Sequence, residues 1–108
     1  MARFRLKFAP EADATLKQLE AAGASEAKRL KKIRKALAYL EQDPRHPGLH
    51  SHLYESFPVD RDVKVWDSYV ENRTPSAWRI FWRYGPDEAA EGAQPQSIIT
   101  ILAIGPHP

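Results

Sequence analysis

The chain has 108 residues, of which 43% are hydrophobic, so we expect one core and a single domain over residues 1–108. The absence of cysteine excludes disulfides and thiolate metal sites and fits a reducing cytoplasm, where we place the protein. The formal net charge of +2 is too small to imply a nucleic-acid partner, and no apolar run has the length of a signal peptide or a membrane span.

The first third of the chain predicts a strand followed by two helices. Residues 3–8 alternate cationic and apolar side chains, which is typical of a half-buried strand. Apolar residues then recur at helical spacing over residues 10–22, and again from Ser25, the expected N-cap, to Asp43. Because a short turn containing Gly23 separates the two helices, we expect them to pack as a hairpin.

The rest of the chain predicts a loop and three strands. Residues 43–62 are rich in proline and histidine and indicate an ordered loop. Three segments rich in β-branched and aromatic residues follow, at 63–70, 77–84 and 97–104, and we expect them to form an antiparallel meander. The order predicts an α+β fold in which helices cover one face of a sheet and the first strand flanks the meander.

The segment 77–84 separates two kinds of side chain. Its even-numbered residues, from Trp78 to Tyr84, are large and apolar or aromatic, so we expect them to face the helices. Arg79 and Arg83 would then lie on the open face, where a guanidinium can bind phosphate oxygens in pairs. The alternative is that both arginines are ordinary surface charges.

The segment 63–70 does not reveal which of its faces is buried. We place Lys64 on the open face beside Arg79. Tyr69 or Trp66 on that face could stack an unpaired base, although an aromatic residue in a strand more often belongs to the core.

The second predicted helix concentrates positive charge. Six cations among eight residues form a stripe that could attract phosphates, and the alternative is a solvated helix face. The six residues are Lys28, Arg29, Lys31, Lys32, Arg34 and Lys35.

The histidines fall into two groups. His107 follows the last predicted strand closely, so its imidazole would reach the rim of the sheet as a proton carrier, unless it is an exposed tail residue. His46, His50 and His52 lie in the proline-containing loop without the spacing of metal ligands, and we expect no metal or cofactor.

Three segments carry a resemblance to a known family. They are Leu40-Glu41-Gln42-Asp43-Pro44 after the second helix, Trp78-Arg79-Ile80-Phe81-Trp82, and the apolar last strand ending at Ile104-Gly105. Together with the order of elements over nearly the whole chain, they resemble the RelE/ParE superfamily of bacterial type II toxins. The resemblance implies a toxin domain with a cognate antitoxin partner.

The resemblance also implies an activity, that of a ribosome-dependent mRNA endoribonuclease without a metal. By position, Arg79 matches the family's arginine that stabilises the phosphorane, and Lys64 is similar to a supporting lysine. RelE-like enzymes continue with a cationic, tyrosine-bearing tail, so here His107 must transfer the protons. The RNA-binding residues implied are Arg83, Tyr69, Arg73, Lys28, Lys31, Lys32 and Lys35.

Two other functions stay open within the same resemblance. A ParE-like inhibitor of DNA gyrase needs no catalytic residues and would make His107 expendable. A toxin-derived interaction protein would have lost catalysis altogether. Both alternatives imply an antitoxin partner as well.

Overall fold

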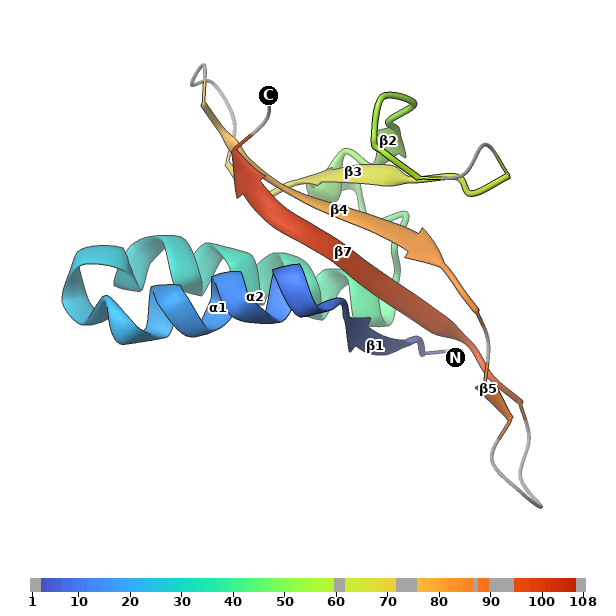
Figure 1. The fold of residues 1–108 in the computed structure, drawn as a ribbon, viewed down its shortest axis with the longest axis horizontal. Coiled ribbons are helices and arrows are strands. Elements are labelled where there is room, and N and C mark those ends of the chain that lie inside the picture. The colour runs from blue at the N-terminus through green and yellow to red at the C-terminus, as the bar shows by residue number, and fades with distance from the viewer. Residues whose placement is uncertain (1–2, 60–61, 72–75, 87, 90–94, 107–108) are drawn as a thin grey trace.

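The computed structural model describes residues 3–59, 62–71, 76–86, 88–89 and 95–106. Two helices lie against one face of a five-stranded sheet whose strands follow the order β1-β7-β4-β3-β2 (Figure 1). The predicted α+β class is confirmed, but the sheet has one strand more than expected. In the described part of the chain, no helix has the length and apolarity needed to cross a bilayer.

The helical hairpin matches its prediction except at one cap. Helix α1 (Pro10–Ala21) and helix α2 (Ala27–Gln42) are joined by a 3₁₀ turn, η1 (Gly23–Glu26). The prediction that Ser25 caps α2 is wrong, because its hydroxyl donates to the carbonyl of Ala22 at 3.0 Å inside this turn. Helix α2 buries one face against the sheet, as the apolar spacing predicts. The buried residues are Leu30, Ile33, Ala36, Leu37 and Leu40.

The last strand of the meander is β7 (Ile98–Pro106), and the first strand of the chain flanks the meander at β7 as predicted. Strand β1 (Arg5–Phe8) pairs with β7 in parallel, and β4 (Trp78–Tyr84) pairs with it antiparallel. Strand β3 (Trp66–Tyr69) pairs with β4, and the two-residue β2 (His52–Leu53) extends the sheet beyond β3. Because β2 is so short and lies in a proline-rich segment, its sequence contains no strand pattern.

The connection between β4 and β7 contains a second, smaller sheet. The structure places a two-stranded ribbon there, formed by β5 (Glu88–Ala89) and β6 (Pro95–Gln96).

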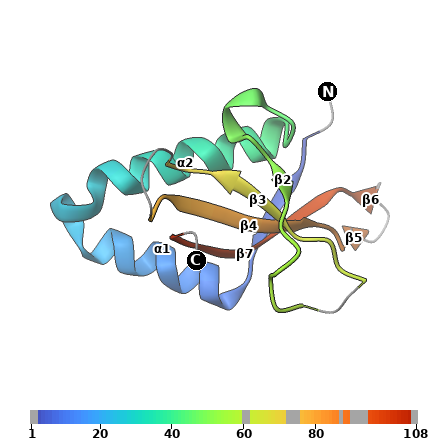
Figure 2. The same cartoon turned by 90° about the horizontal axis from the view of Figure 1, so that it is seen from above.

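The side chains of β4 divide between the two faces of the sheet as predicted. Ile80 and Trp82 are fully buried in the core that the helices cover. Phe81 lies on the other face, where Tyr54 and Phe57 contact its ring at centroid distances of 5.2 and 5.5 Å. The segment after β2 therefore crosses over part of the face that the helices leave open (Figure 2).

A chain of hydrogen bonds connects the core to the loop after α2. The indole Nε1 of Trp82 donates to Ser68 Oγ at 2.7 Å, and the hydroxyls of Ser68 and Ser51 lie 2.7 Å apart. Because the Ser51 hydroxyl donates to the carbonyl of Pro44 at 3.0 Å, we infer that Ser68 donates to Ser51. All three hydrogen bonds then run in the same direction, and both Trp82 and Ser68 are fully buried.

Replacing Ser68 with alanine should lower the free energy of unfolding by about 1–3 kcal/mol, because the buried indole N–H loses its acceptor. Urea denaturation followed by tryptophan fluorescence measures the change. Ser97→Ala, at an exposed serine, is the matched control and should be nearly neutral. Equal stability of the two variants would contradict the role of this hydrogen-bond chain.

Candidate nucleic-acid interface

Arg79 lies on the open face of the sheet, as predicted, but its charge is compensated. Its guanidinium carbon lies 3.8 Å from the centroid of the Tyr69 ring, and its Nη1 lies 3.4 Å from both carboxylate oxygens of Asp67. The Arg79 side chain is only 14% exposed and Asp67 is fully buried. The expectation of a solvent-facing guanidinium therefore needs correction, since a phosphate would compete with an existing ion pair.

The register of β3 against β4 explains this arrangement. Tyr69 lies opposite Arg79, and Asp67 lies opposite Phe81, so both β3 residues share the open face. Their neighbour Ser68 points toward the helices and bonds to Trp82. The structure thus resolves which face of the segment 63–70 is buried.

The same register corrects the predicted position of Lys64. Lys64 precedes β3, and Tyr69 is the β3 residue that pairs with Arg79. Five positions separate Lys64 from Tyr69, which corresponds to about 16 Å along an extended chain. Lys64 is exposed and instead lines a hollow formed with the segment after β2. The structure does not bring Lys64 and Arg79 together.

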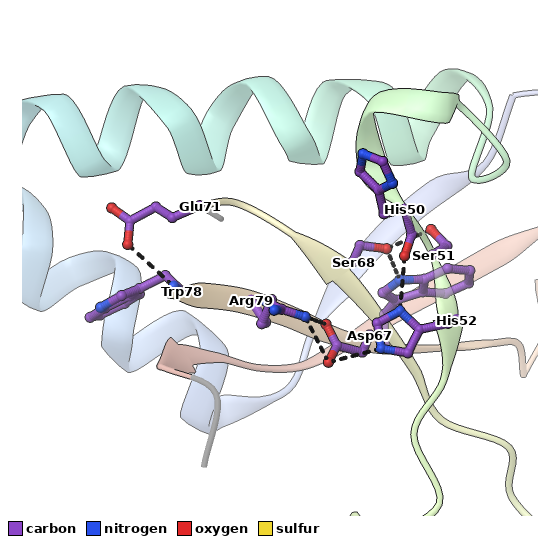
Figure 3. A network of polar contacts seen from close by, with 9 residues as sticks. His50, Ser51, His52, Asp67, Ser68, Glu71, Trp78 and Arg79 are labelled. Carbon is purple, nitrogen blue, oxygen red and sulfur yellow. Dashed lines mark hydrogen bonds and ion pairs between the residues drawn. The ribbon is translucent and has the colours of Figure 1, made fainter. Parts of the chain in front are cut away.

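His52 joins the Arg79 cluster from β2. Its Nε2 lies 3.5 Å from Asp67 Oδ2, and its Nδ1 lies 2.9 Å from the carbonyl oxygen of His50 (Figure 3). The carbonyl can only accept, so we infer that Nδ1 carries the hydrogen of the neutral ring and that Nε2 is the proton acceptor. With a side chain that is 47% exposed, His52 is a candidate proton carrier.

The His46 and His50 rings contact different tyrosines. The His46 ring stacks on Tyr39 at a centroid distance of 3.9 Å, and its Nδ1 accepts from the amide of Gly48. The His50 ring lies 5.0 Å from Tyr69. Within the ranges that the structure describes, no three or more His, Asp or Glu side chains cluster as ligands of a metal ion.

A basic hollow, which we call the lysine groove, separates α2 from β3 and from the short helix η2 (Pro47–Leu49). It consists of two adjoining hollows of about 490 and 340 Å³. Lys32 and Tyr69 line both hollows, and Lys35 lines the second. The lysine groove therefore places two lysines and an aromatic ring around one surface, which is a combination suited to single-stranded nucleic acid.

Comparisons with protein families, with curated proteins and with solved structures found no match to this chain. The geometry of the lysine groove and of the Arg79 cluster is therefore the basis for a functional inference.

The structure brings four of the predicted site residues together, namely Lys32, Lys35, Tyr69 and Arg79. Lys28 and Lys31 are exposed on the outer face of α2, and Arg83 lies at the far end of β4, where its Nε donates to the carbonyl of Tyr84 at 3.3 Å. Arg73 and His107 lie outside the described residues.

Asp67 and His52 are the two residues of the cluster that sequence reasoning missed. Asp67 lies in a predicted strand whose buried face the sequence does not reveal, and His52 lies in a segment without the residue pattern of a strand. An acidic residue two positions before an aromatic one in a strand is the one available signal, because both must lie on the same face.

Proposed function

We propose that this chain is a RelE/ParE-like toxin of a type II toxin–antitoxin system that cuts mRNA on the ribosome and so inhibits translation. The order of strand, helical hairpin and meander supports this finer description of the fold. The observation that carries the functional proposal is the position of Tyr69, which lines the lysine groove and also contacts Arg79, its cross-strand partner on β4. Phosphates, an unpaired base and a guanidinium could meet at this surface.

RNA binding would use the cations and the aromatic ring in different ways. Lys32 and Lys35 would contact phosphates along the lysine groove, and the part of the Tyr69 ring that lines the groove would contact an unpaired base. Lys28 and Lys31 share the same flank of α2, within an arc of about 100°, and would contact ribosomal RNA. A cytoplasmic antitoxin that covers this face would inhibit the toxin.

The proposed reaction is attack of a ribose 2′-oxygen on the neighbouring phosphorus. A base takes the 2′-hydroxyl proton, the 2′-oxygen bonds to phosphorus, and the 5′-oxygen leaves after receiving a proton from an acid. His52 and His107 are the proposed proton carriers, and Arg79 would stabilise the charge of the phosphorane. The substrate supplies its own nucleophile, so the reaction requires no cofactor.

Purified protein added to translating ribosomes should produce cuts at defined positions in the mRNA, mapped by primer extension. His52→Gln should slow cutting by about 10²–10⁴-fold if this imidazole carries the proton. Lys17→Ala, at an exposed lysine of α1 paired with Asp13, should cut at the unaltered rate. Intact mRNA at toxin concentrations that stop growth would contradict the endoribonuclease proposal.

A ParE-like inhibitor of DNA gyrase is the second candidate, and one specific observation favours it. The Arg79 guanidinium is largely buried and paired with Asp67, a pair that catalysis would have to open, whereas gyrase inhibition needs no catalytic residue. Trapped gyrase–DNA complexes in a supercoiling assay would support this candidate. Neither mRNA cuts nor trapped complexes would indicate the third candidate, a non-catalytic interaction protein derived from a toxin.

A further inference from the structure

Another hollow, which we call the aromatic pocket, lies on the side of the sheet that faces the helices. It has a volume of about 400 Å³, within the range of small-molecule sites. The pocket lies next to the loop that follows the end of α2 at Gln42. Tyr84, at the end of β4, is 41% exposed there. The residues that line the pocket are Pro44, Arg45, His50, Ser51, Trp66, Trp82 and Tyr84.

Three aromatic rings form one wall of the pocket. Trp66 and Trp82 are stacked with centroids 5.9 Å apart and an interplanar angle of 19°. Tyr84 meets both rings edge-on, at 6.1 Å from Trp66 and 4.9 Å from Trp82. Because Trp82 is fully buried, Trp66 and Tyr84 are the rings that a ligand could contact. Such rings favour a planar heteroaromatic group.

Arg45 supplies a positive charge beside these rings. Its backbone N–H donates to the Asp43 carboxylate at 2.9 Å, which fixes the turn, and its exposed guanidinium forms no ion pair with a described residue. His50 borders the pocket in the left-handed backbone region, at φ 47°, a conformation that concentrates at functional sites. A guanidinium would repel an ammonium group held among aromatic rings, so the charge favours an anionic ligand.

We propose that the aromatic pocket binds a nucleotide, with its base against Trp66 and Tyr84 and its phosphate on Arg45. The pocket adjoins the lysine groove through the loop after α2, since Gly48 and Leu49 line the groove while Arg45 and His50 line the pocket. One RNA strand could therefore contact both surfaces. The proposal rests on the proposed RNA-binding function only where it takes the nucleotide to be part of an RNA strand. A free nucleotide carries the same base and phosphate and would bind in the same way.

Titration of the purified protein with 5′-AMP, adenosine and a single-stranded RNA hexamer tests this proposal through quenching of tryptophan fluorescence. Arg45→Ala should weaken 5′-AMP binding about tenfold and leave adenosine binding unchanged, because only the phosphate contact is lost. Tyr84→Ala should weaken both, with its fold checked by circular dichroism. Arg34→Ala, at an exposed arginine paired with Glu20 on α1, is the matched control and should bind like the unaltered protein.

The possible outcomes separate the proposals. Tighter binding of the hexamer than of 5′-AMP, sensitive to Arg45→Ala, would identify an RNA strand as the source, and the reverse order would identify a free nucleotide. Nucleotide binding without mRNA cutting would support the nucleotide site in the aromatic pocket and contradict the proposed endoribonuclease function. Unchanged 5′-AMP affinity in Arg45→Ala, no quenching at millimolar nucleotide, or tighter binding of tetramethylammonium than of 5′-AMP would overturn the nucleotide proposal.

Discussion

Replacing Asp67 with alanine should lower the free energy of unfolding by about 3–5 kcal/mol, which is among the largest effects expected of one substitution in this chain. The fully buried carboxylate faces the Arg79 guanidinium, whose side chain is 14% exposed. Among the described residues, Arg79 Nε already lies buried without a hydrogen-bond partner. Removing the carboxylate would leave a buried positive charge without its compensating group. Urea denaturation measures the loss.

Asp13→Ala is the matched control, because it removes a carboxylate from an exposed ion pair with Lys17 and should cost less than about 1 kcal/mol. The double variant Asp67→Ala/Arg79→Ala should cost less than the sum of its two single variants, because neither charge then stays unpaired. Additive losses, or an Asp67→Ala loss no larger than that of Asp13→Ala, would refute the compensation of Arg79 by Asp67. Any test of Arg79 in catalysis must therefore include a measurement of stability.

Replacing both Lys32 and Lys35 with alanine should weaken binding of single-stranded RNA and make it less dependent on salt. Each lysine that contacts a phosphate contributes about one to the slope of log affinity against log salt, so the slope should fall by about 1–2. Both side chains are exposed on α2, so the fold should not change. Fluorescence anisotropy with labelled RNA at several KCl concentrations measures the slope.

The control for this experiment removes the same charge elsewhere. Lys17→Ala/Arg34→Ala alters two exposed cations that pair with carboxylates away from the lysine groove. The slope for this control should match that of the unaltered chain. If both double variants shift the slope equally, net charge alone governs RNA binding and the lysine groove has no special role.

The sequence was sufficient to predict the helices and the orientation of β4, because both follow from local periodicity. Trp82 and Ile80 alternate with Arg79 and Phe81, and only one of these sets can cover a hydrophobic core. The face that carries Arg79 was therefore predictable. The pairing of the Arg79 guanidinium with Asp67 was not predictable, because this carboxylate belongs to another strand.

The partner escaped prediction because β3 offers two plausible faces. Trp66 with Ser68 and Asp67 with Tyr69 each combine an aromatic and a polar residue, so periodicity cannot choose between them. The burial of Ser68 is explained by its hydrogen bond from Trp82, which is a contact between two strands and cannot be read from one strand alone. His52 escaped for a related reason, since a two-residue strand is defined by its pairing and not by its composition.

The position of β7 in the sheet affects when the nascent chain can complete its fold. Strand β7 is the last of the sheet to be synthesised, yet it lies inside the sheet, where it pairs with both β1 and β4. Before β7 leaves the ribosomal tunnel, the nascent chain cannot close its core, and contacts this distant in sequence form slowly. The contacts of Arg79 with Asp67 and Tyr69 join β4 to β3, so they gain the support of a complete sheet only at that late stage.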